Sequence, residues 1–228
     1  MNINTIIKDL KYFDYKYNNY EILNDLFLMS ALSISNSIEL NEKIKAEREN
    51  QYKIIASKYN NADLNQFTKI FAEIIELYES ENISDFLGEI FMQSMTQNSG
   101  AKGQVFTPYA LSKVCAECSI NDEMLKKDII TMYEPACGGG GMIIAFLDAL
   151  KNKHNIDYTT KVFVLAGDVD KRCCAMTYIA LSLLGCPAIV EEKNALSGEF
   201  YDIWETPAYK MQYLKFKDVA RKLVYETK

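Results

Sequence analysis

The sequence predicts an α/β protein: a small doubly wound, Rossmann-like sheet preceded by a helical lobe. Residues 1–99 are almost free of glycine and proline, which favours uninterrupted helices. Between residues 129 and 204, short apolar runs rich in β-branched residues alternate with longer segments of helical spacing. Four consecutive glycines, residues 138–141, stand between the first such strand and the helix after it. This is where a doubly wound sheet holds a nucleotide-like ligand.

Composition narrows the function classes. The N-terminus has no basic segment followed by an apolar core, and no apolar run is long enough to span a membrane, so we expect a cytoplasmic protein. The six cysteines then read as reduced thiols. The spacing of Cys115 and Cys118 suits a metal, but both lie in a predicted helix and the only histidine, His154, is in a polar loop. A zinc site and a histidine-dependent hydrolase are therefore disfavoured, and no metal is expected.

The helical lobe is predicted from apolar residues at helical spacing. One such segment is Tyr20 to Tyr59, whose charged later part, residues 39–58, indicates a solvated helix face. A capping box at residues 63–66 is expected to open the next helix. The buried side of this helix is predicted to carry Phe67, Ile70, Phe71, Ile74, Ile75 and Tyr78. Residues 98–103 have the composition of a linker. We therefore predict a helical lobe over residues 1–99, a Rossmann-like domain over 100–209 and a C-terminal helix over 210–228.

The stretch from Tyr133 to Met142 carries the main functional signal. An acid, Glu134, precedes the glycines, whereas a dinucleotide fingerprint has no acid there. A phosphate-binding loop would end in Gly-Lys-Ser/Thr, and this one ends at Met142. The alternative without a ligand is a tight structural turn. The run Glu134-Pro135-Ala136-Cys137-Gly138-Gly139-Gly140-Gly141-Met142 resembles the Asp-Pro-Ala-Cys-Gly-Ser-Gly-Gly-Met/Phe signature of adenine-N6 DNA methyltransferases, above all the modification subunits of type I restriction systems.

Several companion motifs extend this resemblance over roughly residues 84–204. Residues 85–91 resemble the helix that precedes the family's catalytic domain, and Gly103-Gln104-Val105-Phe106-Thr107-Pro108 resembles its second hallmark, which closes over the methionine end of the cofactor. From the residues alone, Thr107 is a good N-cap and Pro108 a good first helical residue. The resemblance implies S-adenosylmethionine as the cofactor. It is expected to be held by Phe106, Thr107 and Pro108 and by the loop residues Glu134, Pro135, Ala136, Cys137, Gly138 and Gly140.

Further cofactor contacts are expected where the next two predicted strands end. Residues 162–166 predict a buried strand ending at Asp168-Val169, and an acid there suits the two ribose hydroxyls. Asp168 aligns with the family's ribose-binding acid; a surface turn acid is the alternative. Residues 188–190 predict a third strand, after which Asn194-Ala195 matches the family's Asp-x-Leu or Asn-x-Leu position. Asn194 is expected to read the adenine edge of the cofactor through its amide.

The family pattern fails at the expected catalytic motif. After a predicted fourth strand at residues 200–204, the family has Asn/Asp-Pro-Pro-Tyr/Phe, whose acceptors hold the amino group of a flipped adenine while the ring stacks on the base. This chain has Glu205-Thr206-Pro207-Ala208-Tyr209. Only Glu205, Pro207 and Tyr209 offer replacements, and we expect neither the later strands of a complete sheet nor a target-recognition domain in the residues that remain.

Three hypotheses emerge. In the first, the chain is an S-adenosylmethionine-dependent DNA adenine-N6 methyltransferase of restriction–modification type. In the second, it is a catalytically impaired, cofactor-binding regulatory or partner subunit. In the third, which we favour less, it is a methyltransferase that acts on small molecules. The formal net charge of −6 is unusual for a free-standing DNA binder, which leaves weak DNA binding by the chain alone, binding supplied by a partner or a local basic face. We expect DNA to be bound with help from another subunit, in an oligomer. The predicted fourth strand leaves an edge, which we expect the helical lobe, residues 210–228 or a second chain to cover.

Overall fold

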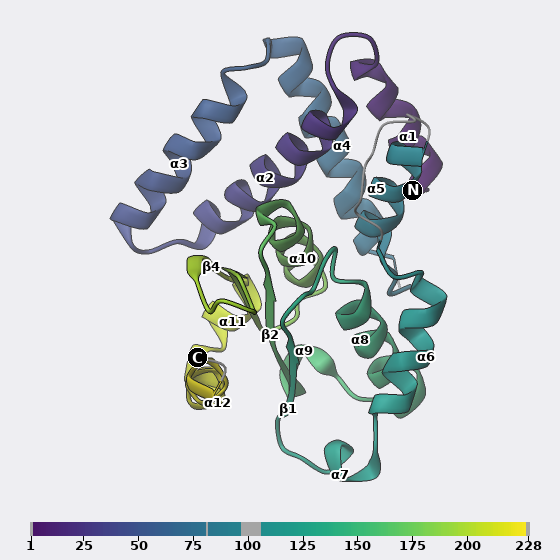
Figure 1. Cartoon of the computed structure of the whole chain (residues 1–228), viewed down its shortest axis with the longest axis vertical. Coiled ribbons are helices and arrows are strands. Elements are labelled where there is room, and N and C mark those ends of the chain that lie inside the picture. Colours follow the sequence, from purple (N-terminus) through teal and green to yellow (C-terminus); the bar gives the residue numbers. More distant parts are fainter. Residues whose placement is uncertain (1, 81, 97–105, 227–228) are drawn as a thin grey trace. The chain divides into compact units, whose positions relative to one another are not determined.

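The computed structural model describes residues 2–80, 82–96 and 106–226 (Figure 1). The chain divides into two compact units, residues 1–82 with 86–105 and residues 83–85 with 106–228. The predicted linker at residues 98–103 and the first three residues of the second hallmark, 103–105, lie outside the described residues. No helix in the described part of the chain is long and apolar enough to cross a membrane.

The first unit is helical. Its elements are α1 (Ile3–Leu10), the 3-10 helix η1 (Lys11–Phe13), α2 (Asn19–Ile38), α3 (Glu42–Ala56), α4 (Asn61–Tyr78) and α5 (Phe86–Thr96). α1 packs against α4 and α5, and α2 packs against α3. As predicted, α3 is almost wholly solvated, with Arg48 as its buried residue. The core of this unit includes Phe13, Phe27, Ile70 and Phe91, all nearly or fully buried.

The start of α4 corrects one prediction. The capping box lies at Asn60 and Asp63, three residues before the predicted one: Asn60 Oδ1 accepts from the amide of Asp63 at 3.0 Å, and Asp63 Oδ2 accepts from the amide of Asn60 at 3.4 Å. Asp63 is also buried, and its Oδ2 accepts from the hydroxyl of Tyr17 at 2.7 Å. This tertiary contact fixes where the helix begins. Of the apolar residues predicted for the buried side of α4, Phe67, Ile70, Ile74 and Tyr78 are buried, whereas Phe71 and Ile75 are half-buried.

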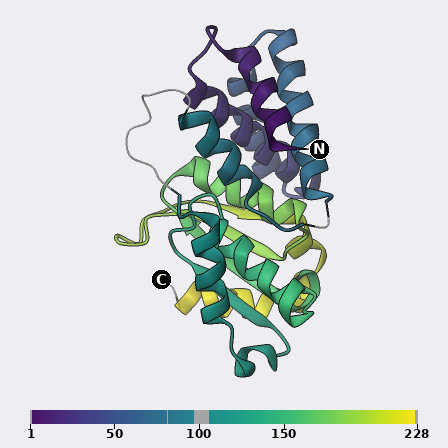
Figure 2. The ribbon, with the colours of Figure 1, turned by 90° about the vertical axis from the view of Figure 1, so that its right-hand side faces the viewer.

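The second unit contains the predicted α/β fold. Its elements are α6 (Tyr109–Ser119), α7 (Asp122–Leu125), β1 (Ile130–Glu134), α8 (Gly141–His154), α9 (Tyr158–Lys161), β2 (Val162–Asp168), α10 (Lys171–Leu183), β3 (Ala188–Lys193), β4 (Phe200–Glu205), α11 (Pro207–Met211) and α12 (Tyr213–Glu226). α6 and α8 lie side by side (Figures 1 and 2). α11 and α12 meet at Gln212 in the region predicted as one C-terminal helix.

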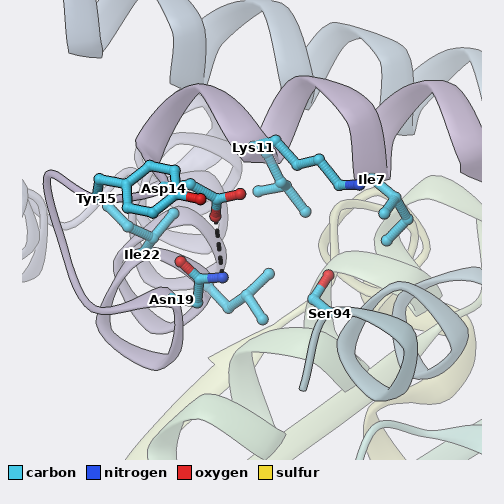
Figure 3. A pocket seen from close by; sticks show the side chains of 9 residues that line it. Ile7, Lys11, Asp14, Tyr15, Asn19, Ile22 and Ser94 are labelled. Carbon is cyan, nitrogen blue, oxygen red and sulfur yellow. Dashed lines mark hydrogen bonds between the residues drawn. The ribbon is translucent and has the colours of Figure 1, made fainter. Parts of the chain in front are cut away.

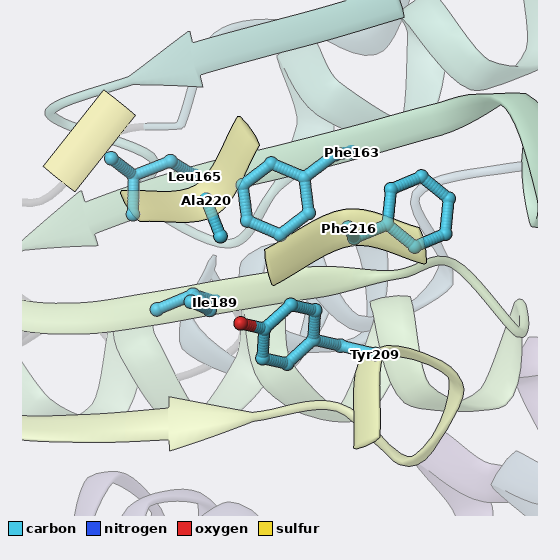
Figure 4. Close-up of a cluster of buried hydrophobic side chains, with 6 residues drawn as sticks. All are labelled: Phe163, Leu165, Ile189, Tyr209, Phe216 and Ala220. Carbon is cyan, nitrogen blue, oxygen red and sulfur yellow. The ribbon is translucent and has the colours of Figure 1, made fainter. Parts of the chain in front are cut away.

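The sheet has the order β1-β2-β3-β4. β1, β2 and β3 are parallel, and β4 is antiparallel to β3, with Glu205 opposite Ile189 and Phe200 opposite Lys193. Helices cover both faces. α10 packs on β2 and β3, while α12 packs on β2 through a cluster of Phe163, Leu165, Ile189, Tyr209, Phe216 and Ala220 (Figure 4). α12 therefore covers a face of the sheet, whereas residues 210–228 were one of the three covers expected for the β4 edge.

Candidate cofactor site at the glycine loop

The glycine loop connects β1 to α8 and arises directly from the local sequence. Ile130 and the apolar residues after it form β1, and residues 143–147 are fully or almost fully buried in α8. Between them, Gly138 has a φ of +53° and Gly140 a φ of +91°. Residues with a Cβ rarely adopt this conformation, so glycine is required at both positions. The turn carries no side chain where α8 begins; Gly138 and Gly141 are half-buried, and Gly139 and Gly140 are buried.

Hydrogen bonds join this loop to the end of β2. The amide of Cys137 donates to the carbonyl of Gly167 at 2.8 Å, and the amide of Gly138 donates to Asp168 Oδ2 at 2.9 Å. The other carboxylate oxygen of Asp168 accepts from the amide of Asp170 at 2.9 Å. Both oxygens of Asp168 are thereby oriented by backbone amides. The structure thus places the predicted ribose acid directly beside the predicted glycine loop.

Acidic side chains surround the loop. Glu134 Oε1 accepts from the amide of Ala136 at 3.2 Å, and a Cβ built on Gly141 would lie 2.8 Å from Asp85 Oδ2. Asp85 is buried, and its carboxylate stands at the start of α8, where negative charge is favourable. A carboxylate at this position opposes the binding of a phosphate group at the same helix end. The electrostatics therefore disfavour a phosphate-binding loop and suit a ligand without phosphate groups.

Phe106 covers part of the loop. Its ring atoms lie 3.3 to 3.6 Å from the positions that a Cβ would occupy on Gly138 and Gly139. Thr107 and Pro108 come next in the chain and are exposed. The N-cap of α6 is Pro108, without a side-chain cap, which corrects the prediction of Thr107 as N-cap. The reason is that Pro108 has an extended ψ of 131°, so the helix begins only at Tyr109.

The remaining predicted cofactor residues fall into two groups. Pro135 and Ala136 lie in the loop itself, and Val169 is exposed just after β2. Asn194 and Ala195 come after β3, at the same edge of the sheet as Asp168, because β3 runs parallel to β2. Asn194 Oδ1 accepts from the amides of Leu196 at 3.0 Å and Ser197 at 3.2 Å. Its side-chain carbonyl is therefore engaged in the turn between β3 and β4.

The thiol of Cys137 is buried and packs beneath the loop. Burial raises its pKa far above the usual range of a thiol, so it stays protonated at neutral pH. Thr177 Oγ1, on α10, lies 3.4 Å from Cys137 Sγ and donates to the carbonyl of Gly138 at 3.0 Å. A neutral, enclosed thiol is not a nucleophile. Among the described residues, no group of three or more histidine, cysteine or acidic side chains could hold a metal ion.

Three residues that support the loop, Thr177, Met176 and Asp85, were not predicted from the sequence. Met176 Cε would lie 3.0 Å from a Cβ on Gly139, and Thr177 Oγ1 would lie 3.1 Å from one on Gly140. Thr177 is a polar residue on a helix whose other buried members are mostly apolar. This isolated polar position in a mostly apolar segment was the feature of the sequence that could have indicated a role for Thr177. Asp85 could be noticed only through its place in the motif at residues 85–91.

The structure does not bring Glu205, Pro207 and Tyr209 to the loop. Because β4 runs antiparallel to β3, it ends beside Ile189, near the start of β3 and thus toward the opposite edge of the sheet from Asp168. The hydroxyl of Thr206 donates to the carbonyl of Cys186, which precedes β3. Tyr209 is buried, with its ring centroid 5.5 Å from that of Phe163. The structure therefore does not support the expected base pocket beside the loop for these three residues.

A known sequence family covers the region of the glycine loop. The sequence model of the N-6 DNA Methylase family matches residues 79–194, just over half of the chain. A solved structure described as a class I S-adenosylmethionine-dependent methyltransferase from Listeria monocytogenes is similar, with 14% identity over 82% of this chain and 52% of that chain and a TM-score of 0.45. The type I restriction-modification system methyltransferase subunit from Streptococcus thermophilus is similar, with 13% identity over 87% of this chain and 40% of that chain and a TM-score of 0.47.

The chain thus spans about half or less of the length of these solved proteins. No curated protein matches it. The family match covers the glycine loop and Asp168, and it ends at Asn194, before β4. The chain belongs to the N-6 DNA Methylase family.

Proposed function

We propose that the chain binds S-adenosylmethionine at the glycine loop and takes part in methylating the amino group of adenine in DNA. The hydrogen bond between Asp168 and the amide of Gly138 carries this proposal, because it fixes an acid beside a bare glycine backbone. A carboxylate at the end of β2 suits two vicinal ribose hydroxyls, each of which is a donor. Family membership supplies the expectation that the substrate is DNA.

The residues present fit this cofactor. A side chain at Gly138 or Gly140 would be strained, so the loop has no side chain of its own at either position. Asp168 would hold the ribose, the loop and Phe106 would enclose the rest, and Asn194 would lie near the base end. When bound, S-adenosylmethionine supplies an electrophilic methyl group on a sulfonium. The residues of this chain orient it, while Asp85 and Glu134 keep the surroundings of the loop acidic.

We propose that the hydrogen-bond acceptors for the amino group of adenine do not come from β4 or α11. The antiparallel direction of β4 leaves Glu205 and Pro207 away from the loop, and Tyr209 is in the core. Methyl transfer depends on in-line positioning, so a cofactor site alone gives little rate. We therefore favour a subunit that holds the cofactor and works with a second polypeptide carrying the base pocket and much of the DNA contact. The net charge of −6 agrees with DNA binding that depends on such a partner.

A regulatory role is the second candidate, and the same separation favours it. In that case the chain binds the cofactor and changes the affinity of a partner without transferring a methyl group. For either role we propose that the protein acts in the cytoplasm, on DNA and with the cofactor present there.

Two measurements on the purified full chain test the proposal. Calorimetry with S-adenosylmethionine and S-adenosylhomocysteine should show binding, and absence of binding would remove the proposal. Transfer of a labelled methyl group to unmethylated DNA should be weak or absent for the chain alone and should appear with the partner protein. Binding without transfer, with or without the partner, would support the regulatory role. Robust transfer by the chain alone would show that a base pocket exists elsewhere in this chain.

A further inference from the structure

A cavity of about 340 Å³ lies within the helical unit, among α1, η1, α2 and α5 (Figure 3). Its size is at the lower end of the range for small-molecule sites. Its apolar lining comes from Ile7 and Leu10 of α1 and from Ile22 and Leu23 of α2. All four are buried in the core of the unit. The residues that line the cavity belong to the helical unit, so a ligand bound there is independent of the proposed function.

Two polar groups that have no hydrogen-bond or ion-pair partner among the described side chains lie on one side of this cavity. Ser94 is 8% exposed, and its hydroxyl has no hydrogen-bond partner in the described part of the chain. A buried hydroxyl without a partner costs free energy that a ligand can recover. Figure 3 shows the ammonium group of Lys11 on the same side as the Ser94 hydroxyl. Lys11 forms no ion pair with any residue that the structure describes.

The opposite side of the cavity carries an acid that is already engaged. Asp14 Oδ1 accepts from Asn19 Nδ2 at 3.2 Å, and both residues line the cavity. A ligand with one negative charge can lie near Lys11, whereas a second negative charge near Asp14 would be repelled. The polar groups therefore favour a monoanion over a dianion.

The rim of the cavity is formed by an unusual residue. Tyr15 lines the cavity, its side chain is exposed, and its backbone has a φ of +66°. A bulky residue rarely adopts this left-handed conformation, and such positions are frequent in ligand-binding segments. In Figure 3 the Tyr15 ring lies beside Asp14. An apolar ligand body resting on this ring would remove part of it from water.

From these observations we propose that this cavity binds a small organic monocarboxylate with an apolar body. The carboxylate accepts hydrogen bonds from the Lys11 ammonium and the Ser94 hydroxyl, both of which are donors. The apolar body lies on Ile7, Leu10, Ile22 and Leu23. The site belongs to the helical unit and is distinct from the cofactor site.

The test uses three probes with the same phenylpropyl body and different heads. Saturation-transfer NMR and calorimetry on the full chain would compare 3-phenylpropanoate, 3-phenylpropan-1-ol and 3-phenylpropylamine, with phenylsuccinate as a dianion. We expect the monocarboxylate to bind about tenfold more tightly than the alcohol or the dianion, since its head makes the charge-assisted contacts. Backbone amide shifts of Leu10, Leu23 and Ser94 should move on binding.

Variants locate the head group. Lys11→Met keeps the length of the side chain and should abolish the difference between acid and alcohol, and Ser94→Ala should reduce it. Lys8→Met is the matched control, because Lys8 is an exposed lysine of α1 outside the cavity lining, and it should leave the difference unchanged. Thermal melting checks that each variant is folded. Equal binding of acid, alcohol and amine, an unaltered preference in Lys11→Met, or no binding of the acid at about 10 mM, where fragment-sized ligands usually register, would overturn the proposal.

Discussion

Asp168 Oδ2 accepts a hydrogen bond from the amide of Gly138 at 2.9 Å, so the end of β2 and the glycine loop are joined directly. Two segments thirty residues apart thereby lie together at one edge of the sheet, which the parallel pairing of β1 and β2 makes possible. This relationship links the geometry of the loop to the proposed cofactor affinity, and it can be tested by substitution.

Asp168→Ala should weaken binding of S-adenosylhomocysteine by roughly 1–3 kcal/mol, because charge-assisted hydrogen bonds to the ribose are lost. Calorimetry measures this difference. Asp218→Ala, at an exposed position of α12, is the control and should bind as the unaltered chain does. Equal affinities for the Asp168 and Asp218 variants would show that Asp168 does not contact the ligand.

Gly140→Ala should destabilise the protein more than Gly198→Ala does. Both glycines have a positive φ, +91° and +75°, so each substitution carries backbone strain of about 1 kcal/mol. A Cβ at Gly140 would also lie 3.1 Å from Thr177 Oγ1, whereas a Cβ at Gly198 meets nothing within 4 Å. Urea unfolding of the two variants separates strain from crowding. A larger loss of stability in Gly198→Ala would contradict this account of the loop.

Tyr209→Ala should reduce the free energy of unfolding by about 3–5 kcal/mol, as expected for removing a buried aromatic side chain. Tyr209 packs against Phe163 and Phe216 in the cluster beneath α12 (Figure 4). Tyr213→Ala, at an exposed ring of the same segment, should cost much less. Urea denaturation provides the comparison. If Tyr209→Ala leaves stability unchanged and instead reduces DNA methylation, the ring stacks on the base after all.

Stability should depend on pH through Glu73 of α4. Burial, followed by a hydrogen bond with Asp9, raises the pKa of Glu73 from 4.5 to about 6. The folded state therefore binds its proton more tightly than the unfolded state does, and this contribution to stability is lost as pH rises from about 4.5 to 6. Glu73→Gln should consequently be more stable than the parent at pH 7, by up to about 2 kcal/mol, and equal to it near pH 4.

The neighbouring Asp9 acts in a different pH window. Lys69 Nζ lies 2.8 Å from Asp9 Oδ2 and lowers the pKa of Asp9 below 3.8, so its contribution to stability is lost only as pH falls below that range. Chemical denaturation between pH 4 and 7 therefore isolates Glu73. Asn65→Gln, at an exposed position of the same helix and without an ionisable side chain, is the control and should give the same difference from the parent at every pH. If the difference in stability between the parent and Glu73→Gln is the same at every pH in this range, Glu73 does not cause the pH dependence.

The antiparallel direction of β4 could have been predicted from the sequence. β3 ends at Lys193 and β4 begins at Phe200, so the connection has only six residues. Parallel neighbours need a crossover of about a dozen residues or more, whereas a short turn joins antiparallel strands. The turn signals are also present, since Asn194 accepts from the amides of Leu196 and Ser197, and Gly198 has a φ of +75°.

The sequence by itself determined the local units of this protein. β1, the glycine loop and the start of α8 result from a β-branched run, from glycines needed at positive φ and from an apolar helix, all of which act over a few residues. β2 was predicted in the same way, as was an acid at its end.

Only the tertiary structure decided which side chains meet across these units. The capping box at Asn60 depends on the contact between Asp63 and Tyr17, 46 residues apart. The support of Gly138 by Thr177 spans 39 residues, and Tyr209 is a core residue because the antiparallel β4 brings α11 against Phe163. Such contacts arise from packing between distant segments, and periodicity and turn chemistry encode only the segments themselves.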